Sequence, residues 1–125
     1  MKLSIAVITW NRVQQLQEAI ESCLACELPS DTQFVIIDNA STDNTADVVN
    51  KLSNKYTTFK WFYEKQTENR GAGIGRNIAF SKAEGDYVYF MDDDAYISNS
   101  FKNFFIDAIN IFDSHPKIAT LTTQI

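Results

Sequence analysis

Short apolar runs alternate with amphipathic segments along the chain, and this alternation constrains the fold more than any other feature. The runs are rich in apolar, β-branched and aromatic residues, as strands buried on both faces of a sheet are. They cover residues 3–9, 33–38, 59–64, 86–91 and, after a turn, 115–125. The repeated order of strand and helix predicts an α/β fold with a mostly parallel open sheet and helices on both faces.

The segments between these runs have the apolar spacing of helices. In the first of them, Leu16, Ala19, Ile20, Cys23 and Leu24 recur at intervals that place them on one helix face. The predicted helices cover residues 15–26, 41–53, 69–83 and 99–112.

Polar and glycine residues mark the expected ends of these helices. Ser41 and Thr42 are candidates for the N-cap of the second helix, and Ser98 or Asn99 for that of the fourth. Gly85 is expected to end the third helix, because glycine adopts the left-handed conformation that many C-caps require.

Composition and charge exclude several function classes. The net charge is −5 and the eleven basic residues are scattered, whereas nucleic-acid surfaces and polybasic membrane patches need clustered Lys and Arg. No apolar run approaches the roughly 20 residues of a membrane span, and the N-terminal run is interpreted as a strand rather than a signal peptide. We therefore expect a cytoplasmic protein, with peripheral association at a membrane as the alternative for a longer chain that contains it.

The two cysteines form a C-x-x-C pair, Cys23 and Cys26, a spacing that zinc and redox sites share. His115 is the only further thiol or imidazole group, and the pair lies late in a helical segment instead of at a helix N-terminus. Ordinary helix packing in the reduced form is the preferred interpretation.

Polar residues follow three of the predicted strands: residues 9–12, Asp38 with Asn39, and residues 92–94. In open α/β sheets, ligands bind outside the carboxyl ends of the strands. Alternation along a strand places Asp92 and Asp94 on one side and Asp93 on the other. Two carboxylates on one side suit Mg²⁺ or Mn²⁺, with coordination positions left for water and phosphate. The alternative is a solvated acidic turn at the start of the next helix.

Other polar residues have both a functional and a structural interpretation. Asp38 is a possible acceptor for a base or ribose, or an acid that braces its turn. Arg12, Arg70 and Arg76 could contact phosphate, or could simply be solvated.

The glycine-rich stretch carries Gly71, Gly73 and Gly75. Its spacing and place match neither the dinucleotide fingerprint nor the Walker pattern. A flexible loop and close helix packing are therefore expected there.

Three blocks of the sequence together resemble the family 2 glycosyltransferases, which have the GT-A fold: SIAVITWNR, FVIIDNASTDNTADVV and NRGAGIGRNIAFSKAEGDYVYFMDDDA. The resemblance runs from residue 3 to the end of the chain, in the family's order and spacing. It implies that residues 1–125 are the N-terminal nucleotide-sugar-binding part of a Rossmann-like GT-A domain, without the acceptor-binding half.

The resemblance also implies roles for individual residues. Asp92 and Asp94 match the D-x-D aspartates that hold Mg²⁺ or Mn²⁺ against the donor diphosphate, and Asp38 matches the acid that contacts the donor base, usually uracil. The implied donor-nucleotide site consists of Thr9, Trp10, Asn11, Arg12, Asp38, Asn39, Arg70, Arg76, Asp92 and Asp93.

The activity implied is inverting transfer of a sugar from a nucleotide-diphosphate sugar, with UDP expected, to a hydroxyl of a glycan, lipid-linked or other acceptor in glycan or cell-surface polysaccharide synthesis. The family's fold needs roughly 200 residues or more, so the general base is expected beyond Ile125. Asp107, Asp113 and Glu84 are expected on the surface instead. The chain by itself is expected to bind donor without transferring sugar, and its open sheet edge predicts self-association.

Three other function classes are alternatives. A nucleotidyltransferase-like enzyme would have a glycine-rich loop after the first strand, where this chain reads TWNRVQQ. A phospho-receiver module would have its acids on strands one and three, whereas here they follow strands two and four. A non-catalytic nucleotide- or metal-binding domain is the remaining alternative.

Overall fold

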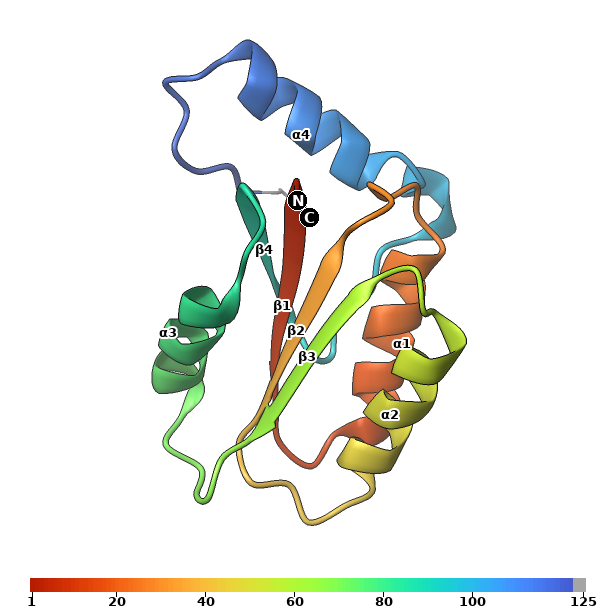
Figure 1. Ribbon diagram of the computed structural model, residues 1–125, viewed down its shortest axis with the longest axis vertical. Coiled ribbons are helices and arrows are strands. Elements are labelled where there is room, and N and C mark those ends of the chain that lie inside the picture. The colour runs from red at the N-terminus through yellow and green to blue at the C-terminus, as the bar shows by residue number, and fades with distance from the viewer. Residues whose placement is uncertain (123–125) are drawn as a thin grey trace.

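The computed structural model describes residues 1–122, and within them four parallel strands form a single sheet (Figure 1). The elements are β1 (Leu3–Thr9), α1 (Val13–Leu24), β2 (Gln33–Asp38), α2 (Thr45–Lys55), β3 (Lys60–Lys65), α3 (Ala72–Lys82), β4 (Tyr87–Asp92), the 3-10 helix η1 (Asn99–Phe101) and α4 (Phe104–Ser114). The strand order is β3-β2-β1-β4. This is the α/β architecture that the alternating pattern predicts.

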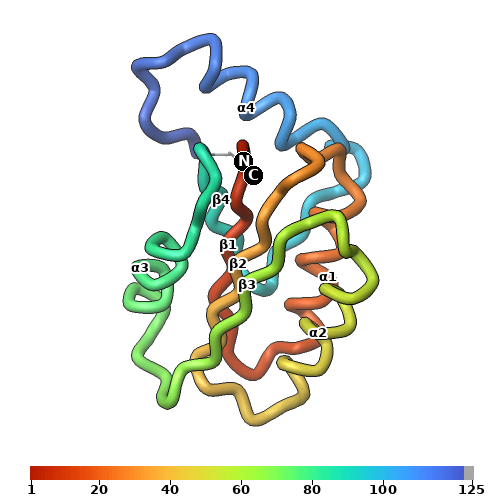
Figure 2. Tube along the Cα trace, in the orientation of Figure 1, coloured from red at the N-terminus to blue at the C-terminus, as the bar shows by residue number. Residues whose placement is uncertain are grey.

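Helices cover both faces of the sheet. The tube in Figure 2 shows α1 and α2 on one side of the strands, α3 on the other, and α4 across the end where β1 begins. Ile5 and Val7 of β1 belong to the larger core, together with Leu16 and Ile20 of α1, whereas Ala6 belongs to a smaller core under α3. The central strands are therefore buried on both faces, which explains their continuous apolar runs.

α3 packs closely on β1. A Cβ atom at Gly75 would lie 2.8 Å from a side-chain carbon of Ile8, and Ala79 is fully buried. The close packing expected of the glycine-rich stretch therefore holds at Gly75. Gly71 precedes α3 with φ of +89°, a conformation that favours glycine.

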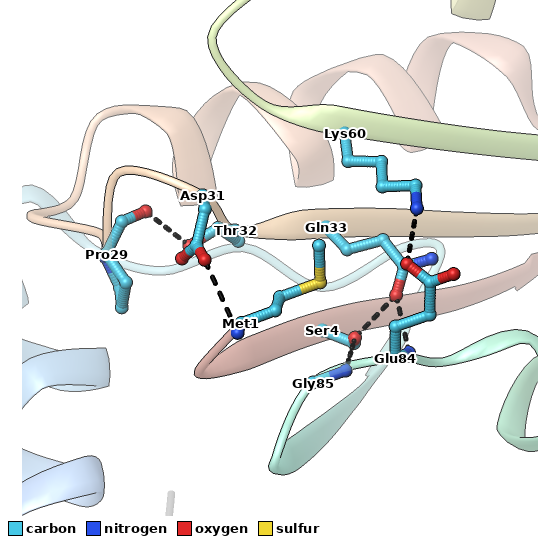
Figure 3. Close-up of polar contacts among 9 residues, drawn as sticks. All are labelled: Met1, Ser4, Pro29, Asp31, Thr32, Gln33, Lys60, Glu84 and Gly85. Atoms are coloured by element: carbon cyan, nitrogen blue, oxygen red, sulfur yellow. Dashed lines mark hydrogen bonds and ion pairs between the residues drawn. The ribbon is translucent and has the colours of Figure 1, made fainter.

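A buried polar network joins β1, β2 and the α3–β4 connection at the amino end of the sheet (Figure 3). The Ser4 hydroxyl donates to Gln33 Oε1 at 2.6 Å and accepts from the Gly85 amide at 2.8 Å. Gln33 Oε1 also accepts from the Glu84 amide, and its Nε2 donates to the Lys82 carbonyl. These bonds hold the chain as it leaves α3 and enters β4.

This network corrects the role expected of Gly85. Helix α3 ends at Lys82 with Ala83 as its C-cap residue, and Gly85 has no positive φ. A Cβ at Gly85 would lie 2.6 Å from the Ser4 nitrogen and 2.7 Å from the Leu3 carbonyl carbon. Glycine is needed here because the backbone of β1 passes too close for a side chain.

The other expected caps also differ from the structure. Asn44 is the N-cap residue of α2, so Ser41 and Thr42 lie outside the helix, and the Asp43 carboxylate accepts from the Thr45 amide. Ser98 caps only η1, because the longer helix α4 begins at Phe104.

The fifth strand predicted over residues 115–125 is wrong for residues 115–122, which form no strand, and residues 123–125 lie outside the described part of the chain. None of the helices in the described part has the length and apolar character that a membrane crossing requires.

Gly85→Ala should destabilise the chain by about 1–3 kcal/mol, the usual cost of overpacking, because the new methyl group meets backbone atoms of β1. Urea unfolding followed by circular dichroism measures this loss. The matched control is Gly73→Ala in α3, where an added Cβ would have no atom within 4 Å. That variant should be neutral or more stable by up to about 1 kcal/mol. Equal stability of the two variants would contradict the close approach at Gly85.

Candidate functional site

A cavity of about 440 Å³ opens at the carboxyl edge of the sheet, between the ends of β1 and β4. The strand order reverses here, between β1 and β4. At this edge α1 begins on one face of the sheet and α3 begins on the other. Loops that separate in this way form the crevice in which α/β proteins bind ligands. The lining residues are Ile8, Thr9, Trp10, Arg12, Asn39, Asn69, Gly71, Ala72, Arg76, Phe90, Met91, Asp92, Asp93 and Asp94.

The three aspartates at the end of β4 face two different environments. Burial alternates along this stretch, so that Asp92 and Asp94 are exposed and Asp93 is buried. Asp93 accepts a hydrogen bond from Thr9 Oγ1 at 3.0 Å and one from Arg12 Nη1 at 3.2 Å. The alternation inferred from the sequence therefore separates one buried, braced carboxylate from two exposed ones, although all three line the cavity.

Each aspartate is also paired with an arginine from a neighbouring element. Arg12, just before α1, lies 3.2 Å from carboxylate oxygens of both Asp93 and Asp94. Arg76 of α3 lies 3.7 Å from Asp92 Oδ1. The charged side chains that line the cavity are thus three carboxylates and two guanidinium groups, which leaves one negative charge in excess.

The loop after β1 and the loop after β2 are joined by hydrogen bonds. Asn11, with φ of +49°, accepts from the Thr42 amide at 2.7 Å through Oδ1, and its own amide donates to Ser41 Oγ at 2.9 Å. Asp43 accepts from the first amide of α1, Val13 N, and from the Thr45 amide of α2. We name residues 11 and 41–43 the loop clasp. Within it the Asn11 side chain is engaged in structure and does not line the cavity.

A second contact joins the β2 loop to α3. Asn39 donates from its backbone amide to the Thr9 carbonyl at 2.9 Å and from Nδ2 to the Gly71 carbonyl at 3.3 Å. Asn69 Oδ1 accepts from the Gly71 amide at 2.9 Å. The first turn of α3 is thereby fixed beside the cavity.

Asp38 is buried, with 1% of its surface exposed, and lies outside the cavity lining. Its carboxylate accepts from the Ser41 amide at 2.9 Å and from the Tyr63 hydroxyl at 2.5 Å. Burial first, and then the hydrogen bond to Asp38, raise the pKa of Tyr63 well above its ordinary value. These contacts are those of an acid that braces its turn, and contact with a nucleotide base stays a prediction.

The structure thus brings Thr9, Trp10, Arg12, Asn39, Arg76 and Asp92 to Asp94 to one cavity. Asn11, Asp38 and the exposed Arg70 lie outside its lining. Phe90 and Asn69 were not predicted as site residues. Phe90 could have been found, because strand alternation places it on the same face as Asp92; Asn69 carries no comparable signal.

The residues present fit a hard divalent cation only in part. Asp92 and Asp94 offer exposed carboxylate oxygens, which Mg²⁺ and Mn²⁺ prefer. No group of three or more acidic, His or Cys side chains among residues 1–122 has metal-binding geometry. Protein oxygens could therefore supply a minority of an octahedral shell, with the remainder from water and a ligand's phosphates.

Other acidic and thiol groups of the described residues are engaged elsewhere. Asp113 pairs with Lys2 at 2.9 Å, and hydrogen bonds from Tyr87 and Lys2 lower its pKa. Glu84 pairs with Lys60. Cys23 is buried in the core, where desolvation raises the pKa of its thiol to about 12, as expected of a packing residue.

Comparison with known proteins is consistent with this geometry. The family model described as glycosyl transferase family 2 matches residues 4–118. The poly(ribitol-phosphate) beta-N-acetylglucosaminyltransferase TarS of Staphylococcus aureus is 34% identical over 116 residues, which are 92% of this chain and 19% of TarS.

Solved structures share the fold. The crystal structure of S. aureus TarS 1–349 in complex with UDP-GlcNAc matches with a TM-score of 0.82 and 28% identity, over 99% of this chain and 37% of that one. The mannosyltransferase PcManGT from Pyrobaculum calidifontis, in complex with GDP-Man and Mn²⁺, matches with a TM-score of 0.82 over 89% of this chain and 32% of that one. At 24% identity, it supports the fold alone. The chain spans about a fifth of the length of TarS.

Tyr63→Phe should lower the free energy of unfolding at pH 7 by about 1–3 kcal/mol, because the buried Asp38 carboxylate loses a donor. The folded-state pKa of Tyr63 is raised, so this contribution is complete below about pH 10 and is lost as pH rises further. The difference between wild type and variant should therefore shrink above pH 10.

Urea unfolding at several pH values measures that difference. The exposed Tyr96→Phe is the control and should leave stability unchanged at pH 7. A Tyr63→Phe difference that is absent at pH 7, or constant from pH 7 to 11, would contradict the assignment.

Proposed function

The chain belongs to glycosyl transferase family 2, and from this premise we propose that its cavity binds a nucleoside-diphosphate sugar, with UDP as the nucleotide. The observation that carries the proposal is the meeting of Asp92, Asp94, Arg12 and Arg76 in one cavity at the switch point of a parallel sheet. Acidic and basic groups together suit a diphosphate that enters with a cation.

The charge balance favours joint entry of nucleotide and cation. A diphosphate alone would meet a lining with one excess negative charge. A Mg²⁺ or Mn²⁺ ion at Asp92 and Asp94 would reverse that excess and supply charge stabilisation for the departing diphosphate. Arg12 and Arg76 are placed to hold phosphate oxygens, since a guanidinium can donate two parallel hydrogen bonds.

The remaining lining orients the nucleotide. Trp10 is half-exposed at the cavity and offers an aromatic face on which a base can stack. Thr9 is fixed by its bond to Asp93, and Asn39 by its bond to Gly71. These residues define a wall beside the carboxylates against which a nucleoside can be held.

The reaction proposed for the whole protein is inverting transfer of a sugar to an acceptor hydroxyl in glycan or cell-surface polysaccharide synthesis. Such a reaction needs a base that deprotonates the acceptor. The acids in the cavity lining are Asp92 to Asp94, which are assigned to the cation and to Arg12. We therefore propose that this chain by itself binds donor without transferring sugar. We also propose that the protein lies in the cytoplasm or at the cytoplasmic side of a membrane.

UDP should bind in the presence of Mn²⁺, and the double variant Asp92→Asn plus Asp94→Asn should bind it at least about tenfold more weakly, a difference of about 1.4 kcal/mol. Isothermal titration calorimetry with and without Mn²⁺ measures this loss. Asp47→Asn, at an exposed acid on α2, controls for the general change in charge. Equal affinity of wild type and double variant would remove the metal assignment.

We further propose that the chain associates with a second copy through the outer edge of β4. This strand ends the sheet, and a second cavity of about 630 Å³ lies between it and α4, lined largely by aromatic and aliphatic side chains such as Tyr89, Phe101 and Ile111. Unpaired strand edges beside apolar surface favour association.

Sedimentation should show a concentration-dependent increase in mass that Phe101→Lys weakens, because a charge would then enter the apolar surface. Phe101 is 63% exposed, so the substitution leaves the core intact. Phe80→Lys, at a phenylalanine 64% exposed on α3, is the matched control and should not change association. A wild-type chain that stays monomeric at high concentration would refute this proposal.

A further inference from the structure

Arg12 makes ion pairs with two aspartates that differ in solvent exposure and in their other hydrogen bonds. Its Nη1 lies 3.2 Å from Asp93 Oδ1 and 3.2 Å from Asp94 Oδ2. The Asp93 side chain is 12% exposed and also accepts a hydrogen bond from Thr9, whereas the Asp94 side chain is 57% exposed. The contact with Asp93 is therefore anchored, and the contact with Asp94 is the exchangeable one.

Backbone contacts fix the place from which Arg12 reaches the aspartates. Arg12 lies between Asn11, which is held by the loop clasp, and Val13, whose amide donates to Asp43. Its carbonyl accepts from the Leu16 amide in the first turn of α1. With backbone and Asp93 both fixed, the guanidinium stays beside the cavity when Asp94 is withdrawn.

We propose that Arg12 exchanges its anionic partner: it neutralises Asp94 in the donor-free protein, and its guanidinium pairs with the donor's diphosphate when a divalent cation takes Asp94. The proposal rests on the donor and cation site proposed above. It assigns to Asp93, which the Thr9 hydroxyl orients, the task of holding Arg12, in place of direct contact with the nucleotide.

The exchange makes binding of cation and nucleotide cooperative. A cation that arrives alone competes with the Arg12 guanidinium for Asp94 and is repelled by its positive charge. When a diphosphate arrives as well, the released guanidinium gains a new anionic partner, because arginine keeps its charge and has five donors. The same residue thus opposes binding of the cation alone and favours the cation together with a nucleoside diphosphate. Coupling of this kind is reciprocal between the two ligands.

The test is a binding cycle for Mn²⁺ with and without UDP, because Arg12 should affect the two measurements in opposite directions. Arg12→Met removes the charge and keeps the apolar stem. It should bind Mn²⁺ alone about three- to tenfold more tightly than wild type, since a charge close to the ion is removed. It should bind UDP in saturating Mn²⁺ more weakly than wild type. The free Mn²⁺ signal in electron paramagnetic resonance gives the first affinity, and calorimetry gives the second.

Three further variants separate charge from shape. Arg12→Lys keeps the charge and should leave the affinity for Mn²⁺ alone close to that of wild type. Arg12→Gln removes the charge but keeps hydrogen-bond donors for Asp93. It should show the same two changes in affinity as Arg12→Met, and it replaces Arg12→Met in the test if Arg12→Met folds poorly. Lys51→Met removes an exposed cation of α2 and should change neither affinity.

The outcomes distinguish this proposal from the one on which it rests. If both uncharged variants bind Mn²⁺ alone with the affinity of wild type, the exchange is overturned. If wild type nevertheless binds UDP only in the presence of Mn²⁺, the proposed donor site still stands. Failure of wild type to bind Mn²⁺ even with UDP overturns the cation site and the exchange together. Tighter Mn²⁺ binding combined with weaker UDP binding supports the exchange, because a general loss of folding would weaken both.

Discussion

The position of β1 between two parallel neighbours determines where the chemistry of this chain lies. Its ladders pair Thr9 with Asp38 of β2 and Ile8 with Asp92 of β4. Because parallel strands end at the same edge, residues far apart in the sequence meet there, and Thr9 bonds to Asp93 across 84 positions. At the same edge α1 begins on one face of the sheet and α3 on the other, and the cavity lies beside the first turn of α3.

Much of the fold could be predicted from local sequence pattern. The predictions that failed outright, at Gly85 and after residue 115, depended on contacts with distant parts of the chain. β1 and β2 have the bounds that the sequence predicts, because central strands are apolar throughout and turn residues limit them sharply. β3 and β4 are displaced by one residue, since strands at the edges of the sheet are partly exposed. The expected C-cap at Gly85 failed because the reason for glycine lies in β1, some eighty residues earlier. A strand after residue 115 failed because a ladder requires a partner, which no local pattern guarantees.

The candidate site, too, could be predicted from the sequence only in part. Convergence of polar residues at one sheet edge follows from topology, and so could be inferred before the structure. The pairing of side chains within the edge could not. Nothing in the local sequence indicates that Tyr63 takes up one oxygen of Asp38, or that Arg12 bridges two aspartates of β4. Asn11 likewise belongs to the loop clasp, since its side-chain Oδ1 accepts hydrogen bonds from the amides of Thr42 and Asp43 in another loop.

The loop clasp has a consequence for how such a chain can change over evolutionary time. Asn11 satisfies amides after β2, Ser41 accepts from the amide of Asn11, and Asp43 satisfies the first amide of α1. Each loop therefore completes the hydrogen bonds of the other. A loop taken from a relative would arrive without its partner and would leave donors unmatched on both sides. We therefore expect substitutions in one of these loops to require matching substitutions in the other.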